Sequence, residues 1–251
     1  MLDPEIGRHS GPLARDDYPV WREVFDGAMS TSTGNEIDFS VSEAIRTMRA
    51  MRRLKPDPVP RELLEQIVEL ASFAPTGGNT QTYSYVVVDD RSQIARIAPL
   101  WRRCQSWYIA SQRGAAPPTT TAEKWSRVMG ATDFLAANFE AVPALIVACL
   151  EMRTVKRRML AQLGPAARAT VGLGVRDALS LARNFSHFTR LSADACIYPG
   201  VENLLLAARS LGLGASLATW HLLFEQEFKQ ILTLPPEVDT YAVVPIGYPL
   251  G

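Results

Sequence analysis

The longest apolar run in the chain, Ala141 to Leu150 (AVPALIVACL), is the feature that most limits what this sequence can fold into. A helix that crosses a bilayer takes about 20 apolar residues, so this run is too short to span a membrane, and it also contains Pro143. A short apolar run bounded by polar residues is typical of a buried β-strand. The sequence therefore predicts a strand over about 143–149 inside a globular core, and no membrane span.

Two further segments read as strands because they are rich in β-branched and aromatic residues: Tyr83–Asp89 (YSYVVVD) and Tyr241–Gly247 (YAVVPIG). The rest of the chain alternates loops with stretches of helical character. The predicted helices cover about 40–55, 60–74, 91–112, 122–140, 199–211 and 222–232, and the stretch 151–192 is interpreted as helix, loop, helix. Because strands and helices alternate without a regular βαβ series, we expect an α+β or mixed α/β fold around one central sheet.

The first predicted helix carries a cluster of arginines. Ser40 followed by Glu43 indicates a capped start, and apolar residues recur at helical spacing as far as Met51. On such a helix Arg46, Arg49 and Arg53 share one face. Several guanidinium groups on one face can grip a phosphate, although arginines near the C-terminal end of a helix also serve simply to complement its dipole.

Proline and glycine mark the ends of the other helices. Pro60 suits the first position of the second helix, and Pro199 is predicted to open the helix over 199–211. Gly212 and Gly214 then end that helix. Residues 114–121 (GAAPPTTT) are typical of a loop.

The loop Pro75–Gln81 (PTGGNTQ) joins a predicted helix to a predicted strand. Its glycines let backbone N–H groups approach a ligand closely, and its Asn and Gln side chains each offer a donor and an acceptor. This mixture suits the edge of a flavin ring. The same residues are also common in ordinary turns, so the loop alone does not decide between a binding site and a simple connection.

The segment Gly212–Thr219 (GLGASLAT) excludes two other kinds of site. Leu217 stands where a GxGxxG dinucleotide-binding loop needs glycine. Ser216 with the nearby His221 superficially resembles a hydrolase nucleophile elbow, but an elbow needs a strand before the serine, whereas a helix precedes this one.

The bulk properties exclude several classes of protein. The formal net charge is zero, which gives no whole-chain case for nucleic acid as a partner. Three distant cysteines, Cys104, Cys149 and Cys196, suit a reduced compartment, and the histidines show no zinc-binding spacing, so no metal is expected. The N-terminus lacks the pattern of a signal peptide, so we expect a cytoplasmic location.

The first 38 residues lack clear periodicity and hold scattered Gly, Pro, Ser, Thr and Asp. The sequence therefore predicts two parts: an irregular N-terminal extension over 1–38 and one folded domain over 39–251.

Four segments, in order, resemble the nitroreductase family. They are Ala44–Pro60 (AIRTMRAMRRLKPDPVP), Ala74–Tyr83 (APTGGNTQTY), Tyr198–Ala208 (YPGVENLLLAA) with the following Gly-Leu-Gly, and Val244–Pro249 (VPIGYP). The resemblance spans about 40–250 and is weak in the middle. It implies an α+β sandwich, in which helices flank a central, mostly antiparallel sheet, and a homodimer with FMN at the dimer interface.

The resemblance also implies a function: transfer of electrons from NADPH or NADH through flavin N5, in a ping-pong reaction, to a small organic acceptor such as a nitroaromatic or a quinone. Arg49 and Arg52 would contact the phosphate or ribityl chain, Asn79 and Gln81 the ring or ribityl hydroxyls, and the backbone of Ala218 and Thr219 the ring. No catalytic acid or base is expected. The full set of expected cofactor-binding residues is Arg49, Arg52, Arg53, Thr76, Gly77, Asn79, Gln81, Ala218, Thr219 and Gly247.

Some residues depart from the family pattern. Met48 and Ala50 stand where the family often has arginine and serine, and Thr82 stands where it has proline. These departures leave open a flavin-binding or sequestering protein with a degraded site and little reductase activity. A pocket lined by aromatic residues of the middle segment is a further hypothesis, against the alternative that they are core or interface residues. Its members are Trp101, Trp107, Tyr108, Trp125, Phe185 and Phe188.

Overall fold

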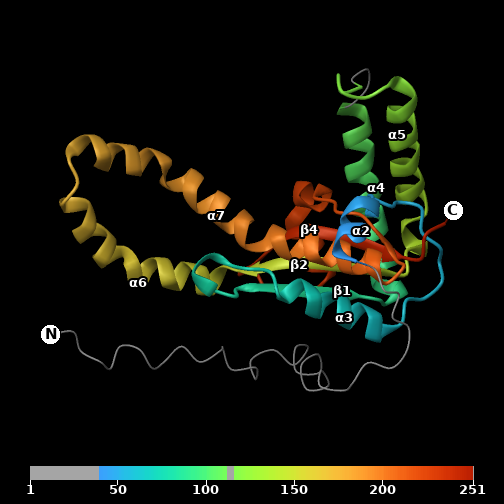
Figure 1. Ribbon diagram of the computed structural model, residues 1–251, viewed down its shortest axis with the longest axis horizontal. Coiled ribbons are helices and arrows are strands. Elements are labelled where there is room, and N and C mark those ends of the chain that lie inside the picture. Colours follow the sequence, from blue (N-terminus) through green and yellow to red (C-terminus); the bar gives the residue numbers. More distant parts are fainter. Residues whose placement is uncertain (1–39, 112–115, 251) are drawn as a thin grey trace. The chain divides into compact units, whose positions relative to one another are not determined.

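The protein, seen here as a computed structural model that describes residues 40–111 and 116–250, is built around a four-stranded antiparallel sheet (Figure 1). The strands are β1 (Tyr83–Val88), β2 (Ala144–Glu151), β3 (Gly214–Ala215) and β4 (Val238–Gly247), and their order across the sheet is β1-β2-β4-β3. All three predicted strands are confirmed, although β4 begins at Val238 rather than at Tyr241. The predicted extension over 1–38 lies outside the described residues.

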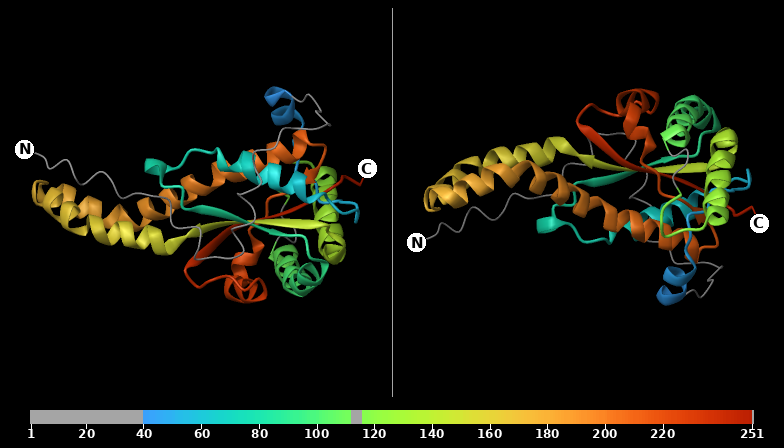
Figure 2. Two further views of the ribbon diagram at one scale, coloured as in Figure 1. Left: turned by 90° about the horizontal axis from the view of Figure 1, so that it is seen from below. Right: turned by 90° about the horizontal axis from the view of Figure 1, so that it is seen from above.

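Helices cover both faces of this sheet (Figure 2). The α-helices are α2 (Val41–Thr47), α3 (Arg61–Ser72), α4 (Arg91–Ser111), α5 (Ala122–Ala137), α6 (Met152–Val171), α7 (Val175–Ser210) and α8 (Glu225–Ile231). Three short 3-10 helices join them: η3 (Gly77–Asn79), η4 (Phe139–Ala141) and η5 (Trp220–Phe224). Helices with a central antiparallel sheet make an α+β fold, as predicted.

Alternation along β2 divides the core into two layers. Ile146 and Leu150 point to one face and pack with Ile67 of α3 and Leu204 of α7. The intervening residues, such as Val147, point to the other face and pack with side chains of α4, α5 and α8. Successive side chains of a strand point to opposite faces, so a fully apolar strand is what a sheet covered on both sides needs. This is why the run AVPALIVACL is apolar throughout.

The first helix is shorter than predicted. Its start is confirmed, since the Ser40 side chain accepts a hydrogen bond from the backbone N–H of Glu43. It ends at Thr47, however, and Met48 is already extended, so the prediction of one helical arginine face was wrong. The chain leaves the helix because Met51 N–H donates to the Ala215 carbonyl at 2.9 Å and Leu54 pairs with Pro249. Backbone pairing with distant segments overrides the local helical pattern.

Pro199 does not open a helix, contrary to the prediction. It lies inside α7, which runs through it for 36 residues. Ile197, Gly200 and Val201 around it are buried against the sheet, and this packing holds the helix in spite of the missing N–H donor. Pro60, likewise, is the N-cap of α3 rather than its first residue. The prediction of helix, loop, helix over 151–192 is confirmed by α6 and the start of α7.

The end of α7 agrees with the prediction from glycine. Gly212 has a positive φ of 76°, Leu213 N–H donates to the Ala208 carbonyl at 2.8 Å, and Gly212 N–H donates to the Arg209 carbonyl at 3.1 Å. This pair of bonds is the Schellman motif, which favours glycine at the left-handed position. The turn sends the chain directly into β3 and the segment that follows it.

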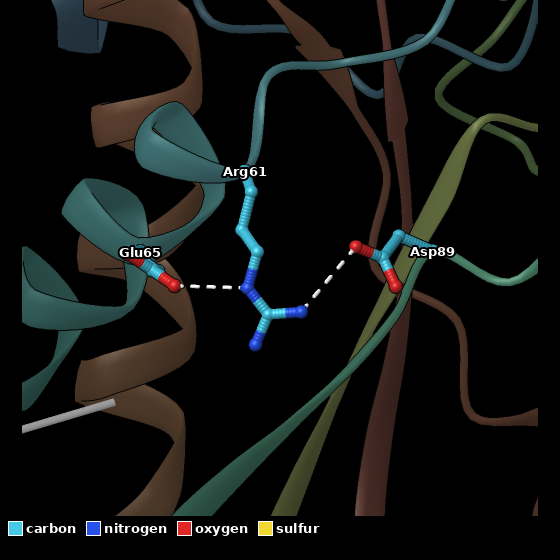
Figure 3. A network of polar contacts seen from close by, with 3 residues as sticks. All are labelled: Arg61, Glu65 and Asp89. Carbon is cyan, nitrogen blue, oxygen red and sulfur yellow. Dashed lines mark hydrogen bonds and ion pairs between the residues drawn. The ribbon is translucent and has the colours of Figure 1, made fainter. Parts of the chain in front are cut away.

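A small polar network ties the start of α3 to the end of β1 (Figure 3). Arg61 Nε lies 3.0 Å from Glu65 Oε1 on the same helix, and its Nη1 lies 3.8 Å from Asp89 Oδ2. The three side chains are about half exposed, so the network stabilises the fold by well under about 1 kcal/mol per pair.

Candidate functional site

Backbone pairing brings two of the predicted segments together. Residues 48–54 run beside β3, where Ala50 forms a bridge with Ala215. Alternate side chains of this extended segment point to opposite sides, so Arg52 is half-buried while Arg53 is exposed. Arg52 therefore reaches the segment that follows β3.

The segment after β3 has backbone N–H donors without a partner among the described residues. Ala218 exchanges both of its backbone hydrogen bonds with Val243 of β4, at 3.0 and 2.9 Å. The N–H groups of the neighbours Leu217 and Thr219 consequently point away from β4, because N–H directions alternate along an extended chain. This edge of the sheet offers hydrogen bonds that the described part of β4 does not use.

These two segments line one pocket, with a volume of about 150 Å³. Of the predicted cofactor-binding residues, Arg52, Ala218 and Thr219 belong to it. The remaining lining comes from α4, α5 and the adjoining backbone: Trp101, Tyr108, Val128, Met129, Thr132, Leu135, Ser216, Leu217 and Trp220. Sites that enclose a drug-sized ligand measure about 300–1,000 Å³, so this pocket covers only part of a larger ligand.

Aromatic rings form one wall of the pocket. The Trp220 ring lies 5.0 Å from that of Tyr108 and 5.7 Å from that of Trp101, centroid to centroid, and Trp101 stacks on Phe139 at 4.5 Å. Trp101 is fully buried, and its indole N–H has no acceptor among the described residues. Such buried donors are rare unless a ligand or water completes them.

Sequence reasoning found part of this wall. Trp101 and Tyr108 were among the six aromatic residues proposed to line a pocket, whereas Trp107 is exposed on α4 and outside the lining. Trp220 and the α5 residues were missed. Because Trp220 directly follows Thr219, it could have been predicted to lie near the site. No pattern in the sequence indicates that α5 packs at this edge of the sheet.

Arg52 is the one charged residue of the lining. Its partial burial lowers the pKa of the guanidinium, while the nearby Tyr108 raises it. An arginine remains a cation at neutral pH in spite of such a shift. Arg52 Nη1 donates to the Ala50 carbonyl at the long distance of 3.4 Å, which engages only one of its five N–H donors. The pocket thus holds a partly desolvated positive charge suited to an anionic group.

The loop 76–81 has an unusual backbone. Gly78, Asn79 and Gln81 have φ angles of 59°, 50° and 47°, in the left-handed region that asparagine tolerates better than most residues and glutamine less well. Thr76 Oγ1 accepts from Gln81 N–H at 3.2 Å, and Cys196 Sγ of α7 accepts from Gly77 N–H at 3.4 Å. Strain of this kind concentrates at functional sites, where the surrounding structure maintains it.

Within one chain this loop lies away from the pocket. The loop leads into β1 and the pocket adjoins β3, at opposite edges of the sheet, which are three strand spacings of about 4.8 Å apart. They also differ in face: Gly77 contacts α7, which covers one face, whereas Trp101 of α4 belongs to the other. Thr76, Gly77, Asn79 and Gln81 therefore do not join Arg52, Ala218 and Thr219 in a single chain.

Three predicted residues have other contacts. Arg49 Nη1 donates to the Arg46 and Met48 carbonyls at 2.9 and 2.6 Å, so its guanidinium turns back onto α2. The Arg53 guanidinium lies 4.9 Å from the centre of the Phe134 ring. Gly247 is packed so closely that an added Cβ would lie 2.6 Å from Pro143 Cγ, which gives its lack of a side chain a structural reason.

The described residues were also searched for a metal site, for a membrane-spanning helix and for a histidine near the pocket. In 40–111 and 116–250, no group of three or more His, Cys, Asp or Glu side chains is placed so that it could hold a metal ion. Among the helices of those same ranges, none is long and apolar enough to cross a bilayer. His221 is fully buried against Thr240 and lies outside the pocket lining, as does the exposed His187.

Solved structures define the class of fold. The chain is similar to iodotyrosine deiodinase bound to FMN and 3-iodo-L-tyrosine, with a TM-score of 0.55, 18% identity, and 84% of this chain and 90% of that chain covered. It is also similar to a BluB-like flavoprotein from Clostridium difficile 630, with a TM-score of 0.56, 18% identity and the same coverage. At such identities the likeness shows the fold, which is the nitroreductase fold.

The chain belongs to the nitroreductase family, whose profile it matches over residues 45–248. A relative from Methanothermobacter thermautotrophicus, provisionally named an NADH dehydrogenase/NAD(P)H nitroreductase, is 23% identical over 221 residues, which cover 86% of this chain and 81% of that protein. The family places the chain among enzymes of flavin-dependent oxidoreduction that act on small molecules.

Proposed function

We propose that this protein is an FMN-dependent oxidoreductase that transfers electrons from NADPH or NADH to a small organic acceptor, such as a nitroaromatic or a quinone. The observation that carries the proposal is the convergence in one pocket of Arg52, the free edge of the segment Ser216–Thr219, and a wall of aromatic rings. A partly desolvated cation, backbone donors and flat apolar walls suit a flavin ring.

The residues of the pocket fit the proposed cofactor. Flavin rings carry alternating donors and acceptors along one edge, and Leu217 and Thr219 of the lining each have a backbone N–H that could donate to it. FMN, when bound, supplies the redox chemistry, so the protein needs no general acid or base. In agreement, the only ionisable side chains in the lining are Arg52 and Tyr108.

On this proposal Arg52 contacts a different part of FMN from the part that the family resemblance implies. It was expected at the phosphate or ribityl chain, but it shares its pocket with Ala218 and Thr219, the residues assigned to the ring. We therefore infer that Arg52 faces the ring edge at N1 and C2, where reduction places negative charge. A fixed cation in a partly desolvated site stabilises such charge far more than water does.

The rest of the cofactor site comes from a second chain on this proposal. The pocket is too small for all of FMN, and the loop with Thr76, Gly77, Asn79 and Gln81 lies at the opposite edge of the sheet. A homodimer in which the loop of one protomer completes the pocket of the other reconciles these positions. Asn79 and Gln81, whose backbones have positive φ angles and whose side chains are exposed, would then contact a cofactor bound mainly by the other chain.

A titration with FMN tests the proposal. The apoprotein should quench flavin fluorescence with saturation at one FMN per chain, and the complex should then oxidise NADPH or NADH when a nitroaromatic or a quinone is added. Stoichiometric binding without oxidation of either nicotinamide would instead identify a flavin-binding or sequestering protein, the alternative that Met48 and Ala50 leave open. Absence of saturable binding would contradict both functions.

A further inference from the structure

Charge is distributed unevenly along this chain, although its formal net charge is zero. The segment 152–192, which forms α6 and the first half of α7, contains eight Lys and Arg residues and a single acidic residue, Asp177. We call this segment the basic arm. Its formal charge is +7, so the rest of the chain carries −7. A local charge of this size attracts an anionic partner even when the whole chain is neutral.

The cations of the basic arm are not used to hold the fold together. Figure 1 shows α6 and the first half of α7 running out beyond the sheet to the turn that joins them. Six arginines of the arm have described side chains, and all are exposed and without an ion pair to another described residue: Arg153, Arg157, Arg168, Arg176, Arg183 and Arg190. Their charge is therefore free to meet a partner.

The turn at the end of the basic arm is apolar. Val171 ends α6, Val175 begins α7, and Leu173 stands between two glycines; the three side chains expose 86%, 79% and 41% of their surface. Arg168 precedes Val171 by about one helical turn, and Arg176 directly follows Val175, so a cation lies on each side of the turn. Other exposed apolar side chains lie along the arm: Leu160, Leu179, Leu181, Phe185, Phe188 and Leu191.

The backbone of this turn makes local hydrogen bonds. Leu173 N–H donates to the Thr170 carbonyl at 3.0 Å, and the Gly174 carbonyl accepts from two N–H groups in the first turn of α7, both at 3.0 Å. Polar groups that are already paired cost less free energy to move out of water than unpaired ones. The turn can therefore enter a region that holds less water, such as the boundary between lipid headgroups and acyl chains.

The placement of the charges favours an anionic lipid surface over a nucleic acid. Around the axis of α7, Arg176, Arg183 and Arg190 lie within about 100° of Val175, whereas Asp177 lies about 200° away. Cations beside an apolar edge are what a helix needs to reach headgroup phosphates while apolar side chains enter the lipid. Nucleic acid is held mainly through its phosphates, and the aliphatic side chains of the turn would then stay in water.

We propose that the basic arm binds the surface of an anionic lipid bilayer, with the turn Val171–Val175 among the headgroups and Arg168 and Arg176 at the phosphates. Such binding is peripheral and needs no helix that spans the bilayer. It combines attraction of the arm's cations to anionic lipid with burial of exposed apolar side chains. The arm contains neither the loop 76–81 nor any residue of the Arg52 pocket, so binding to lipid does not depend on the flavin.

Sedimentation of the full-length protein with lipid vesicles tests the apolar turn. The wild type should bind vesicles that contain phosphatidylserine and phosphatidylcholine, and Val175→Asp should weaken this binding by at least about tenfold. Val41→Asp is the matched control, because Val41 is also the first residue of its helix and is 72% exposed. It should bind like the wild type. An acidic residue in the first turn of a helix is favourable, so both variants should fold normally.

A second pair of variants tests the charge. Arg168→Gln combined with Arg176→Gln should weaken binding to the same vesicles by about 10- to 30-fold, since each cation at an anionic surface contributes about 1 kcal/mol of attraction, or roughly fivefold in affinity. The control combines Arg96→Gln with Arg127→Gln, two exposed arginines on α4 and α5, and should change binding by less than about threefold. Added salt should weaken wild-type binding, because it screens the charges.

Four outcomes would overturn the proposal. The first two are a wild type that binds no vesicles, and one that binds pure phosphatidylcholine equally well. The third is a Val175→Asp variant that binds vesicles like the wild type but has a lower molar mass by light scattering, which would show that another protein chain covers the turn. The fourth is a DNA or RNA duplex that displaces the protein from vesicles and whose binding requires Arg168 and Arg176 but not Val175, which would make nucleic acid the partner.

Discussion

The Nε2 atom of the buried His221 lies 3.1 Å from Thr240 Oγ1, and this contact fixes the tautomer of the imidazole. Thr240 Oγ1 donates to Glu225 Oε1 at 2.9 Å, because a carboxylate only accepts. The hydroxyl has no second proton, so His221 Nε2 is the donor to Thr240. The lone pair is then on Nδ1, which has no partner among the described residues. Burial lowers the pKa of His221 to about 4, although Glu225 opposes the shift.

Acid should destabilise the protein through this histidine. An unfolded histidine has a pKa of 6.5, so between pH 6.5 and about 4 the unfolded chain binds a proton that the folded chain does not. Stability from this group is present above pH 6.5 and is lost as the pH falls, by an amount on the order of 3 kcal/mol. In urea titrations across this pH range, the free energy of unfolding should fall less steeply with falling pH for His221→Gln than for the wild type. Parallel pH profiles for the two proteins would contradict the account.

Alanine substitutions at Gly247 and Gly130 should change the free energy of unfolding in opposite directions, and they test whether Gly247 is needed for packing or for the cofactor. Gly247→Ala would push a Cβ to 2.6 Å from the rigid Pro143 ring and should lower the free energy of unfolding by about 1–3 kcal/mol. Gly130→Ala meets nothing within 4 Å in the middle of α5 and should raise it by about 0.5–1 kcal/mol. Both are measured by chemical denaturation. If Gly247→Ala keeps full stability but loses FMN, then Gly247 acts on the cofactor and its packing role is refuted.

Arg52 and Arg53, which are adjacent in sequence, should behave differently. Arg52→Ala removes the charge from the pocket and should weaken FMN binding by about 10- to 100-fold, the worth of hydrogen bonds to a charged group. Arg53→Ala removes a contact with the Phe134 ring, which is outside the pocket lining, and should change the affinity by less than about threefold. Fluorescence titration gives both constants. A larger effect at Arg53 would place the cofactor on the other side of this segment.

Mixing two inactive variants should restore activity. Arg52→Glu spoils the pocket, and Asn79→Asp puts a charge on the loop while keeping a residue that accepts the positive φ of 50°. In a mixed dimer both lesions fall on one site and leave the other intact. Equal mixing should therefore recover about a quarter of the wild-type sites by assay of NADPH oxidation. If the mixture stays as inactive as its components, each site is built from one chain.

The features of the fold that depend on local interactions could be predicted from local patterns in the sequence. The strands β1, β2 and β4, the Ser40 cap and the Gly212 ending follow from side-chain composition and from glycine chemistry, and all were predicted. Arg52, Ala218 and Thr219 were each expected near the cofactor from the family resemblance, Arg52 at the phosphate or ribityl chain and the other two at the ring; all three line one pocket, a grouping that the sequence did not predict.

The features that the sequence did not predict depend on contacts between segments that are distant in the sequence. The arginine segment was expected to be helical, but the bond from Met51 to Ala215, more than 160 residues away, draws it into an extended conformation. Pro199 was expected to begin a helix, but burial of Ile197 and Val201 carries α7 through it. Neither effect has a local signal. The wall formed by Trp220 and α5 depends in the same way on contacts between distant segments.

The most direct test of the central claim is the visible absorbance spectrum of the purified protein, loaded with FMN, before and after addition of NADPH or NADH without oxygen. The account predicts protein-bound flavin bands that bleach with either nicotinamide and return when a quinone or a nitroaromatic is added. Flavin bands that persist unchanged in the presence of both nicotinamides would contradict it.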